Sequence, residues 1–390
     1  MGPHLFRLIL LAGLAPPWAA TATASEAAAA ASTQDTGTTA TPATATATAT
    51  ATGMAPSPAD ACAIPPRYGV EATAAAIVRV ACEEHRLWLR PFIDRDGRLA
   101  ALAMTEAERA PLDDGYTPAW QRVARYWRES GTLAAMTAAP GAQSCMPPHG
   151  ERFRDNDCRA FLLDTPWSAA FVSWVMLRAG VPGFVASPRH MDYIIHAWRQ
   201  PERSPFRYAD PFAEKPAPGD LLCFLRAVDE GRGAGGLRAA LSGNGPLPRQ
   251  SHCEVVIAAN PGGDRTLHLV SGNVFNTVVM RQLPLERDGR LQPAAVGPVA
   301  ASGAARSAGD AGIHDAREDD AASGCGPGRA DACDLNRRDW AVLLKLRPQA
   351  QLGAPGAHMP GAPQAPAAQA GQPPPVPATV TPGDPAADGG

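Results

Sequence analysis

The chain has 390 residues, of which 40 are proline and 37 are glycine, and its formal net charge at pH 7 is −3. Its length allows one large domain or two small ones. The slight negative charge and the lack of any lysine- and arginine-rich cluster argue against a protein that binds nucleic acid or anionic lipid.

Residues 1–24 have the pattern of a secretory signal peptide. Arg7 precedes an apolar run over residues 8–15, and the small residues Ala22-Thr23-Ala24 suit signal peptidase. The apolar run is too short to span a bilayer, and no later segment is long and apolar enough to do so. We therefore expect export to the periplasm or the medium. The alternative is an alanine-rich start that carries no signal.

Two low-complexity segments enclose the rest of the chain. Residues 25–60 are rich in alanine and threonine, and residues 349–390 are rich in proline, alanine and glycine. Such segments have little apolar surface to bury, so we expect a disordered linker and a disordered tail. One domain remains between them, over residues 61–348, with insertions at 229–250 and 287–338.

The first half of this domain has helical periodicity. Apolar residues recur at helical spacing over 75–88, and Thr117-Pro118 starts a clearer helix whose apolar face includes two tryptophans. A third helix is the best defined. Thr165 suits its N-cap, Pro166 its first position, and Gly180 its end.

The second half has the pattern of strands. They are expected at 221–226, 253–259, 266–271, 274–280 and 340–346. Helices followed by an antiparallel meander predict an α+β fold, in which the N-terminal helices pack on the meander. We expect the second insertion to be a disordered surface loop.

The chain contains eight cysteines, an even number that suits an oxidising compartment. Short spacing favours Cys145–Cys158 and Cys325–Cys333 bridges, and Cys62–Cys82 is possible. Cys223 and Cys253 lie in apolar runs, where they are either core thiols or one further bridge. The chain has no CxxC pair, HExxH motif, P-loop or dinucleotide glycine motif, so we expect neither a metal nor another cofactor.

Three polar residues form a candidate catalytic set. On the cap assignment above, Ser168 is about the third residue of its helix, where unpaired backbone N–H groups and the helix dipole favour an attacking group. His252 opens a strand and suits a general base, and Asn273 on the next strand suits an orienting residue. Each residue also has a purely structural interpretation: Ser168 as a common first-turn serine, His252 as a histidine at the end of a loop, and Asn273 as part of a Gly-Asn turn.

Further residues are candidates for contact with a substrate. His190 and Tyr193 follow the third helix, where they line a cleft or lie on a surface loop. We add Trp167 and Ser271, the first beside Ser168 and the second close to Asn273.

Four motifs together resemble the CHAP domains, which are cysteine- and histidine-dependent amidohydrolases and peptidases related to NlpC-type cell-wall hydrolases. The motifs lie at 166–174, 215–221, 251–256 and 271–274. The chain is most similar to the bacterial domain of unknown function 2272 family, in which Trp-Ser-Ala-Ala-Phe replaces Trp-Cys-Ala-Ala-Phe. The resemblance covers about residues 67–347 without the insertions.

This resemblance implies a papain-like α+β fold and cleavage of peptidoglycan amide or peptide bonds. It places Ser168 at the nucleophile, His252 at the base and Asn273 at the orienting residue. The sequence departs from active CHAP domains at two positions, because the nucleophile is serine and because Ser271 replaces an acidic residue that is common there.

Three hypotheses follow. The first is an exported hydrolase that acts on a peptidoglycan stem peptide or another envelope amide through Ser168, His252 and Asn273. The second is a catalytically inactive relative that binds peptidoglycan or an envelope protein, since a neutral hydroxyl is much less reactive than a thiolate. The third is a structural spacer in the envelope. We expect a monomer with a peptidoglycan or envelope-peptide partner.

Overall fold

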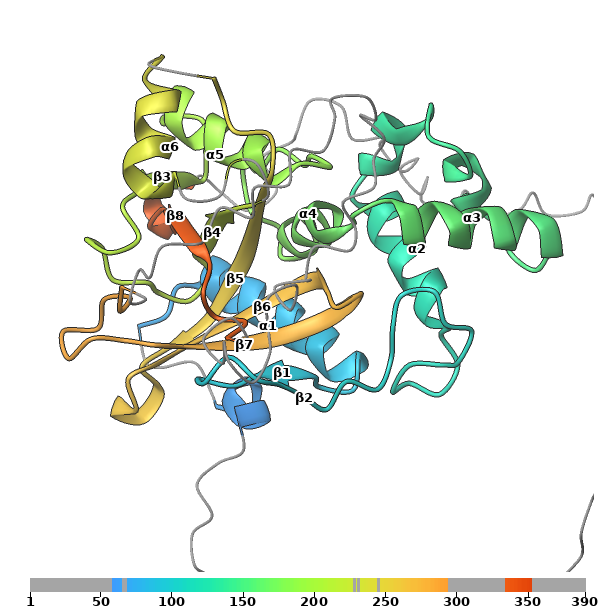
Figure 1. The fold of residues 1–390 in the computed structure, drawn as a ribbon, viewed down its shortest axis with the longest axis horizontal. Helices are drawn as coiled ribbons and strands as arrows, with labels where there is room; N and C mark the ends of the chain where they lie inside the picture. The colour runs from blue at the N-terminus through green and yellow to red at the C-terminus, as the bar shows by residue number, and fades with distance from the viewer. Residues whose placement is uncertain are drawn as a thin grey trace, which may run out of the picture. The chain divides into compact units, whose positions relative to one another are not determined.

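The computed structural model describes residues 58–64, 69–226, 229, 232–243, 246–293 and 334–352. The predicted signal peptide lies outside the described residues, as do nearly all of both low-complexity segments, most of the second insertion and the proposed Cys325–Cys333 bridge. The described part has an α+β fold, as predicted, with six α-helices and one eight-stranded sheet (Figure 1).

The helices are α1 Ala72–Leu87, α2 Ala119–Glu129, α3 Arg152–Asp164, α4 Ser168–Arg178, α5 His190–Arg199 and α6 Gly233–Leu241. The strands are β1 Phe92–Ile93, β2 Leu99–Ala100, β3 Phe206–Ala209, β4 Leu221–Leu225, β5 Ser251–Ala259, β6 Thr266–Val274, β7 Thr277–Pro284 and β8 Asp339–Leu346.

The sheet has the strand order β2-β1-β7-β6-β5-β4-β8-β3. Strands β4 to β7 form the predicted antiparallel meander. β8 pairs antiparallel with β4 on one side and with β3 on the other, so the last strand in the sequence lies inside the sheet. β1 is parallel to β7 and adds a short edge with β2.

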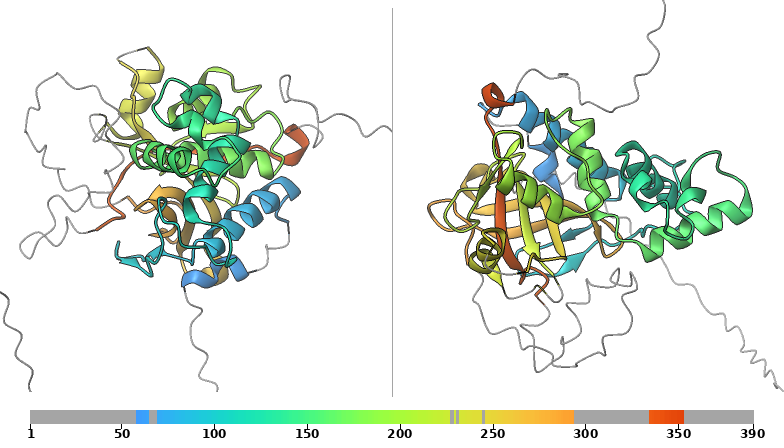
Figure 2. Two further views of the ribbon diagram at one scale, coloured as in Figure 1. Left: turned by 90° about the vertical axis from the view of Figure 1, so that its right-hand side faces the viewer. Right: turned by 90° about the horizontal axis from the view of Figure 1, so that it is seen from above.

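Both faces of the sheet are buried. In β4, Leu221, Cys223 and Leu225 belong to the large core beneath the helices, whereas Leu222 and Phe224 belong to a smaller core on the opposite face. Because side chains alternate along a strand, a continuous apolar run is what burial of both faces requires. α1, α4 and α5 contact the sheet, and α2 and α3 extend the helical layer outward (Figures 1 and 2).

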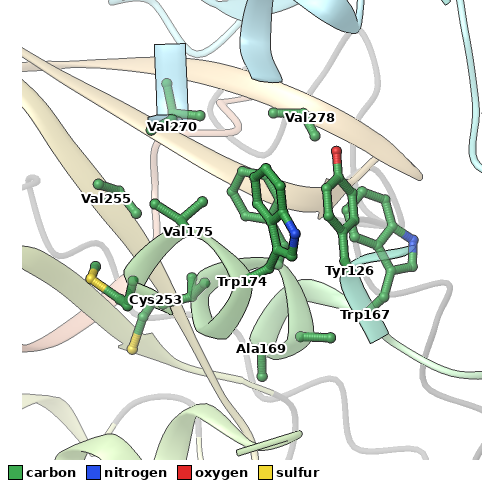
Figure 3. Packing of buried hydrophobic residues seen from close by; sticks show 14 of the residues in the cluster. Tyr126, Trp167, Ala169, Trp174, Val175, Cys253, Val255, Val270 and Val278 are labelled. Carbon is green, nitrogen blue, oxygen red and sulfur yellow. The ribbon is translucent and has the colours of Figure 1, made fainter. Parts of the chain in front are cut away.

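Aromatic side chains fix the start of α4 in the core. The ring of Trp167 stacks against Trp88 and against Tyr126, with ring centroids 5.8 Å and 5.6 Å away. Its Nε1–H donates to Glu106 Oε2 at 2.6 Å. Figure 3 shows the aromatic residues of this region beside valines of β6 and β7. The first turn of α4 is therefore held in place by packing as well as by its backbone.

The boundaries of α4 differ from the prediction. Thr165 is the C-cap of α3, Trp167 is the N-cap of α4, and Ser168 is the first residue of the helix and not the third. Thr165 and Pro166, which the sequence pattern assigned to the start of α4, instead belong to the short connection between α3 and α4.

Two expected loops contain helices. Residues 190–199 form α5, and the first insertion contains α6. The β6–β7 turn lies at Phe275-Asn276, where φ is 51° and 59°, so the predicted start of the next strand at residue 274 was too early.

Three disulfides cross-link the described residues. Cys145–Cys158 and Cys62–Cys82 are both present, as the spacing suggested. Cys223 and Cys253 form the further bridge, which the sequence had left as one of two possibilities. The last joins β4 to β5 at directly opposite positions of the sheet.

Candidate functional site

Ser168 and His190 meet where the N-termini of two helices approach each other. Each is the first residue of its helix, and His190 Nε2 lies 2.8 Å from Ser168 Oγ. Both side chains are buried, at 4% exposure each. The structure therefore pairs the predicted nucleophile with a histidine that the sequence had placed among the substrate contacts.

His252, the predicted base, is not hydrogen-bonded to Ser168. It is the second residue of β5, and neither ring nitrogen has a hydrogen-bond partner among the described residues. Its ring centroid lies 5.1 Å from that of His190, and its Nε2 lies 3.8 Å from Glu254 Oε1. The two histidine rings are thus neighbours, with His190 next to the hydroxyl.

Asn273 does not orient either histidine in this structure. Its backbone φ is 60°, and its side-chain oxygen has no partner among the described residues. The β5–β6 pairing ends at Val255 and Val270, three residues short of both His252 and Asn273. Asn273 lies on the strand beside that of His252, as expected, but the predicted hydrogen bond between them is absent.

Three of the predicted substrate contacts are core residues. Trp167 is fully buried in the aromatic stack, and Ser271 is 1% exposed within β6. Tyr193 is 3% exposed, and its hydroxyl lies within 2.8 Å of Ser173 Oγ and the carbonyl oxygens of Ala169 and Ser187. None of these three residues lines the pocket described next.

A pocket of about 140 Å³ opens beside Ser168. Its walls come from the starts of α4 and α5 and from the adjoining ends of β4 and β5. The lining residues are Pro166, Ser168, Ala169, Pro188, Arg189, His190, Met191, Arg226, Arg249, Gln250 and Ser251. Sequence reasoning missed Arg226 and Arg249. Arg226 directly follows β4 and Arg249 lies two residues before β5, and these positions were the available signal.

Both histidines are held in the neutral form. Burial, with a smaller contribution from the Arg226 charge, lowers the pKa of His190 to about 3. Burial also lowers the pKa of His252 well below its usual value, and His190 and three arginine charges lower it further. At neutral pH each ring therefore has an unprotonated nitrogen, which a base needs, but its affinity for a proton is weak.

The start of α4 also supplies backbone donors. The first helical hydrogen bond runs from the Phe171 N–H to the Trp167 carbonyl, so the N–H groups of Ser168, Ala169 and Ala170 come before the regular ladder. Ser168 and Ala169 line the pocket. These groups are suited to hold negative charge that develops on a bound carbonyl oxygen.

A buried ion pair lies behind His252. Arg281 Nε is 3.0 Å from both carboxylate oxygens of Glu254, and the two side chains are 1% and 0% exposed. Arg281 also donates to the carbonyl of Leu335 and to Asn336 Oδ1, which ties the segment before β8 to β7. The pair neutralises two charges that would otherwise be buried alone.

No group of three or more histidine, cysteine or acidic side chains within the described ranges is arranged to hold a metal ion. Across the same ranges, no single helix is long and apolar enough to cross a membrane. α3 and α4 together satisfy the length and composition but meet at a bend of 101°.

A family model described as "Uncharacterized protein conserved in bacteria (DUF2272)" matches residues 114–346, which include α4, α5 and all the strands that line the pocket. Neither the curated proteins nor the solved structures contain a match to this chain.

Proposed function

The chain belongs to the bacterial family DUF2272, and because the description of that family assigns no activity, we propose from the site itself that the protein hydrolyses an amide or peptide bond with Ser168 as nucleophile. The observation that carries the proposal is the buried Ser168–His190 hydrogen bond at the mouth of a pocket. A serine hydroxyl stays protonated at neutral pH and needs such an aligned base to attack a carbonyl.

The proposed reaction follows the acyl-enzyme scheme of serine hydrolases. Ser168 Oγ attacks the carbonyl carbon while its proton passes to His190 Nε2, and the N–H groups of Ser168 and Ala169 hold the oxyanion. The C–N bond then breaks, and His190 gives the proton to the leaving amine. Water attacks the acyl-enzyme by the same route, which restores Ser168 and releases the acid.

We infer a papain-like domain of the CHAP type and a substrate in peptidoglycan or another envelope amide. A nucleophile at a helix start that packs against a histidine-bearing antiparallel sheet supports the fold assignment. The motif resemblance and the signal-like N-terminus support an exported envelope enzyme, which we propose is a monomer. The base differs from the one the motif implied, because the geometry favours His190 over His252.

A second candidate function is binding without cleavage. Two observations favour it: the low proton affinity of His190, and the lack of any partner for its Nδ1 among the described residues. In a catalytic triad that nitrogen donates to a third residue, which stabilises the imidazolium that forms. A protein of this kind would hold peptidoglycan or an envelope protein in the same pocket.

Incubation of the protein with purified peptidoglycan, followed by mass spectrometry of soluble fragments, tests the two candidates. Wild type should release fragments. Ser168→Ala should reduce the release rate at least about a thousand-fold, because loss of a nucleophile removes the covalent route. Ser242→Ala, an exposed serine at the end of α6, is the matched control and should leave the rate unchanged.

A fluorophosphonate probe, which modifies activated serines whatever the natural substrate, separates a wrong substrate from a wrong function. Labelling of the peptide that contains Ser168 in wild type, and its loss in Ser168→Ala, would support the hydrolase with another substrate. Absence of both labelling and fragments would favour the binding protein. A Ser168→Cys variant adds a further test. If it releases peptidoglycan fragments and wild type does not, the result would also favour the binding protein.

A further inference from the structure

A buried tyrosine lies beside Ser168 and His190, the proposed catalytic pair. Tyr193 comes three residues after His190 in α5, so the two side chains are neighbours on one face of the helix. Their ring centroids are 5.8 Å apart and their planes meet at 85°. His190 is thus in contact with Ser168 through Nε2 and with Tyr193 through its ring.

The Tyr193 hydroxyl joins α5 to the first turn of α4. It donates to the Ala169 carbonyl oxygen at 2.8 Å, and Ala169 directly follows Ser168. Burial raises the pKa of this hydroxyl above its usual value, so it keeps its proton at neutral pH and can donate it to a carbonyl. The starts of α4 and α5 are therefore joined twice, by the Ser168–His190 bond and by the Tyr193–Ala169 bond.

Ser173 of α4 attaches the segment that leads into α5. Its Oγ lies 2.6 Å from the Tyr193 hydroxyl oxygen and 3.0 Å from the Ser187 carbonyl oxygen, and it accepts the Ser187 N–H at 3.1 Å. The Tyr193 hydroxyl also lies 2.7 Å from the Ser187 carbonyl oxygen. All three side chains are buried. Such a network favours one arrangement of the two helices over others.

Ser187 in turn fixes the start of α5. Its Oγ accepts the Arg189 N–H at 3.1 Å and donates to a carboxylate oxygen of Asp192. Pro188 and Arg189, which follow it in the chain, line the pocket. The network behind Tyr193 therefore holds both the helix that carries the base and the pocket wall next to that helix.

The orientation of the His190 ring depends on its neighbours. In a catalytic triad a third residue orients the base through its second ring nitrogen, but His190 Nδ1 has no hydrogen-bond partner among the described residues. The ring of His252 also contacts His190, yet within the described ranges neither of its nitrogens is hydrogen-bonded. Tyr193 differs from His252 because its own polar atom is anchored in the core.

We propose that Tyr193 is a positioning residue for the hydrolysis, whose anchored hydroxyl holds the His190 ring in line with Ser168. The proposal rests on the hydrolase function proposed above. It assigns the orienting role, which the sequence pattern assigned to Asn273, to a residue on the same helix as the base. Tyr193 does not line the pocket, so it acts through His190 and not on the substrate.

Tyr193→Phe removes the hydroxyl and keeps the ring. In the full chain we would measure the rate of fluorophosphonate labelling at Ser168, and kcat and KM on a peptidoglycan fragment. The labelling rate and kcat should fall about ten- to a hundred-fold, because a small misplacement of a catalytic group is costly. KM should be unchanged. Tyr116→Phe removes the same atom from a side chain that is 79% exposed, and should leave all three values unchanged.

Ser173→Ala tests the network from its other end. It removes one neighbour of the Tyr193 hydroxyl and leaves the Ala169 carbonyl in place, so the same rates should fall by less than in Tyr193→Phe. Ser242→Ala, at an exposed serine, is its matched control. Ser173→Ala also decides the question if Tyr193→Phe does not fold.

The NMR signals of the His190 ring nitrogens report on the pair without any turnover. Their assignment comes from His190→Gln, in which they are absent. Ser168→Ala shows where they lie when the bond to the hydroxyl is lost. We expect Tyr193→Phe to move them from the wild-type position toward the Ser168→Ala position, and Tyr116→Phe to leave them in place.

Wild-type labelling rates and wild-type His190 signals in both Tyr193→Phe and Ser173→Ala would overturn the proposal. A lower melting temperature with unchanged rates and signals would do so as well, since the network would then be purely structural. Failure of the hydrolase proposal has a different signature, namely neither labelling nor fragments from wild type. The His190 signals then decide alone: a shift in Tyr193→Phe retains the positioning role, and no shift rejects it.

Discussion

A single hydrogen bond decides how the chemistry of this site is divided among its residues. Ser168 Oγ is within reach of His190 and lies in the pocket wall, whereas His252 lies one ring further away and outside that wall. Proton transfer falls off unless the base is in hydrogen-bond contact with the proton it removes. The two histidines should therefore contribute unequally to turnover.

Glutamine substitutions separate the two histidines. His190→Gln keeps an amide group of similar size but no base, so kcat/KM should fall by about 10²- to 10⁴-fold, the usual value of general base catalysis. His252→Gln should cost less, because His252 is a neighbour of the base and is not bonded to the nucleophile. Steady-state kinetics on a fragment identified from peptidoglycan would measure both. A larger loss for His252→Gln would show that substrate binding rearranges Ser168 toward it, as the sequence motif implied.

His85 is a pH-sensitive residue remote from the pocket. Its Nε2–H donates to the Pro91 carbonyl at 2.9 Å, and burial lowers its pKa to about 4. The folded pKa is depressed, so the contribution of His85 is intact above its unfolded pKa of about 6.5 and is lost as the pH falls toward 4. Between pH 7 and pH 5 the loss is about 2 kcal/mol.

Urea unfolding of wild type and His85→Leu at pH 7 and pH 5 isolates this effect, because all other titrating groups are common to both proteins. The stability deficit of His85→Leu at pH 7 should shrink by about 2 kcal/mol at pH 5. A deficit that is equal at the two pH values would mean that His85 titrates normally in the folded protein.

The candidate residues of the site were largely visible in the sequence, but their pairing was not. Ser168 stood out because a motif surrounds it, and His190 was named only as a cleft residue. Arg189, the N-cap of α5, makes no side-chain capping bond, so no start signal marked that helix. Without a helix start at His190, nothing in the sequence could bring its ring to the first residue of α4.

At the level of elements, the contact between α4 and β6 fixes the position of the nucleophile. Gly272 of β6 faces the start of α4, where an added Cβ would lie 2.5 Å from Trp167 Cζ3 and 2.6 Å from Phe171 Cγ. Such distances are too short for any real contact, and both rings are packed in the core. Only a glycine lets the strand approach this close.

Gly272→Ala should therefore move the first turn of α4 and, with it, Ser168. We expect a loss of about 1–3 kcal/mol in the free energy of unfolding from overpacking, and a fall in turnover larger than the stability loss explains. Gly235→Ala in α6 is the matched control. Its Cβ would meet nothing within 4 Å, so it should be neutral or stabilise by up to about 1 kcal/mol. Wild-type stability and turnover of Gly272→Ala would contradict the proposed contact.

Elements with a long periodic pattern were predicted well, and short ones were not. The strands of the meander and β8 all carry continuous or alternating apolar runs, and α1, α2 and α4 carry apolar faces. β1 and β2 have two residues each, which is too few for a period in the sequence to be recognised. They form because β1 pairs with the edge of β7 and β2 pairs with β1. Pairing partners far apart in sequence leave no local trace.

At the scale of the whole molecule, three disulfides cross-link three separate regions of the described part. One bridge joins residues near the start to α1, one closes the segment before α3, and one joins two central strands of the sheet. Disulfides of this kind persist in oxidising compartments and are rare in the cytosol of mesophiles. This supports the proposal that the protein is exported.

The Cys223–Cys253 bridge should contribute most of the three, because it closes the longest loop, 30 residues in sequence against 20 and 13. In the chain-entropy account, Cys223→Ala/Cys253→Ala should cost about 3 to 4 kcal/mol and Cys145→Ala/Cys158→Ala about 3 kcal/mol. Equilibrium unfolding of the two double variants measures both. No loss in either would mean that the bridges are not formed in the native protein.

The place of β8 inside the sheet has a consequence for how the chain folds. β3 pairs only with β8 among the described strands, although β3 ends at Ala209 and β8 begins at Asp339. Until the last strand has emerged, β3 has no neighbour and β4 presents one open edge, which is the kind of surface on which chains aggregate. Pairing over such a separation also makes folding slow. Under the proposed export, a chain that crosses a membrane with its N-terminus first would pair β8 with β3 and β4 last. A chaperone that covers the β4 edge during such a translocation should then raise the yield of native protein.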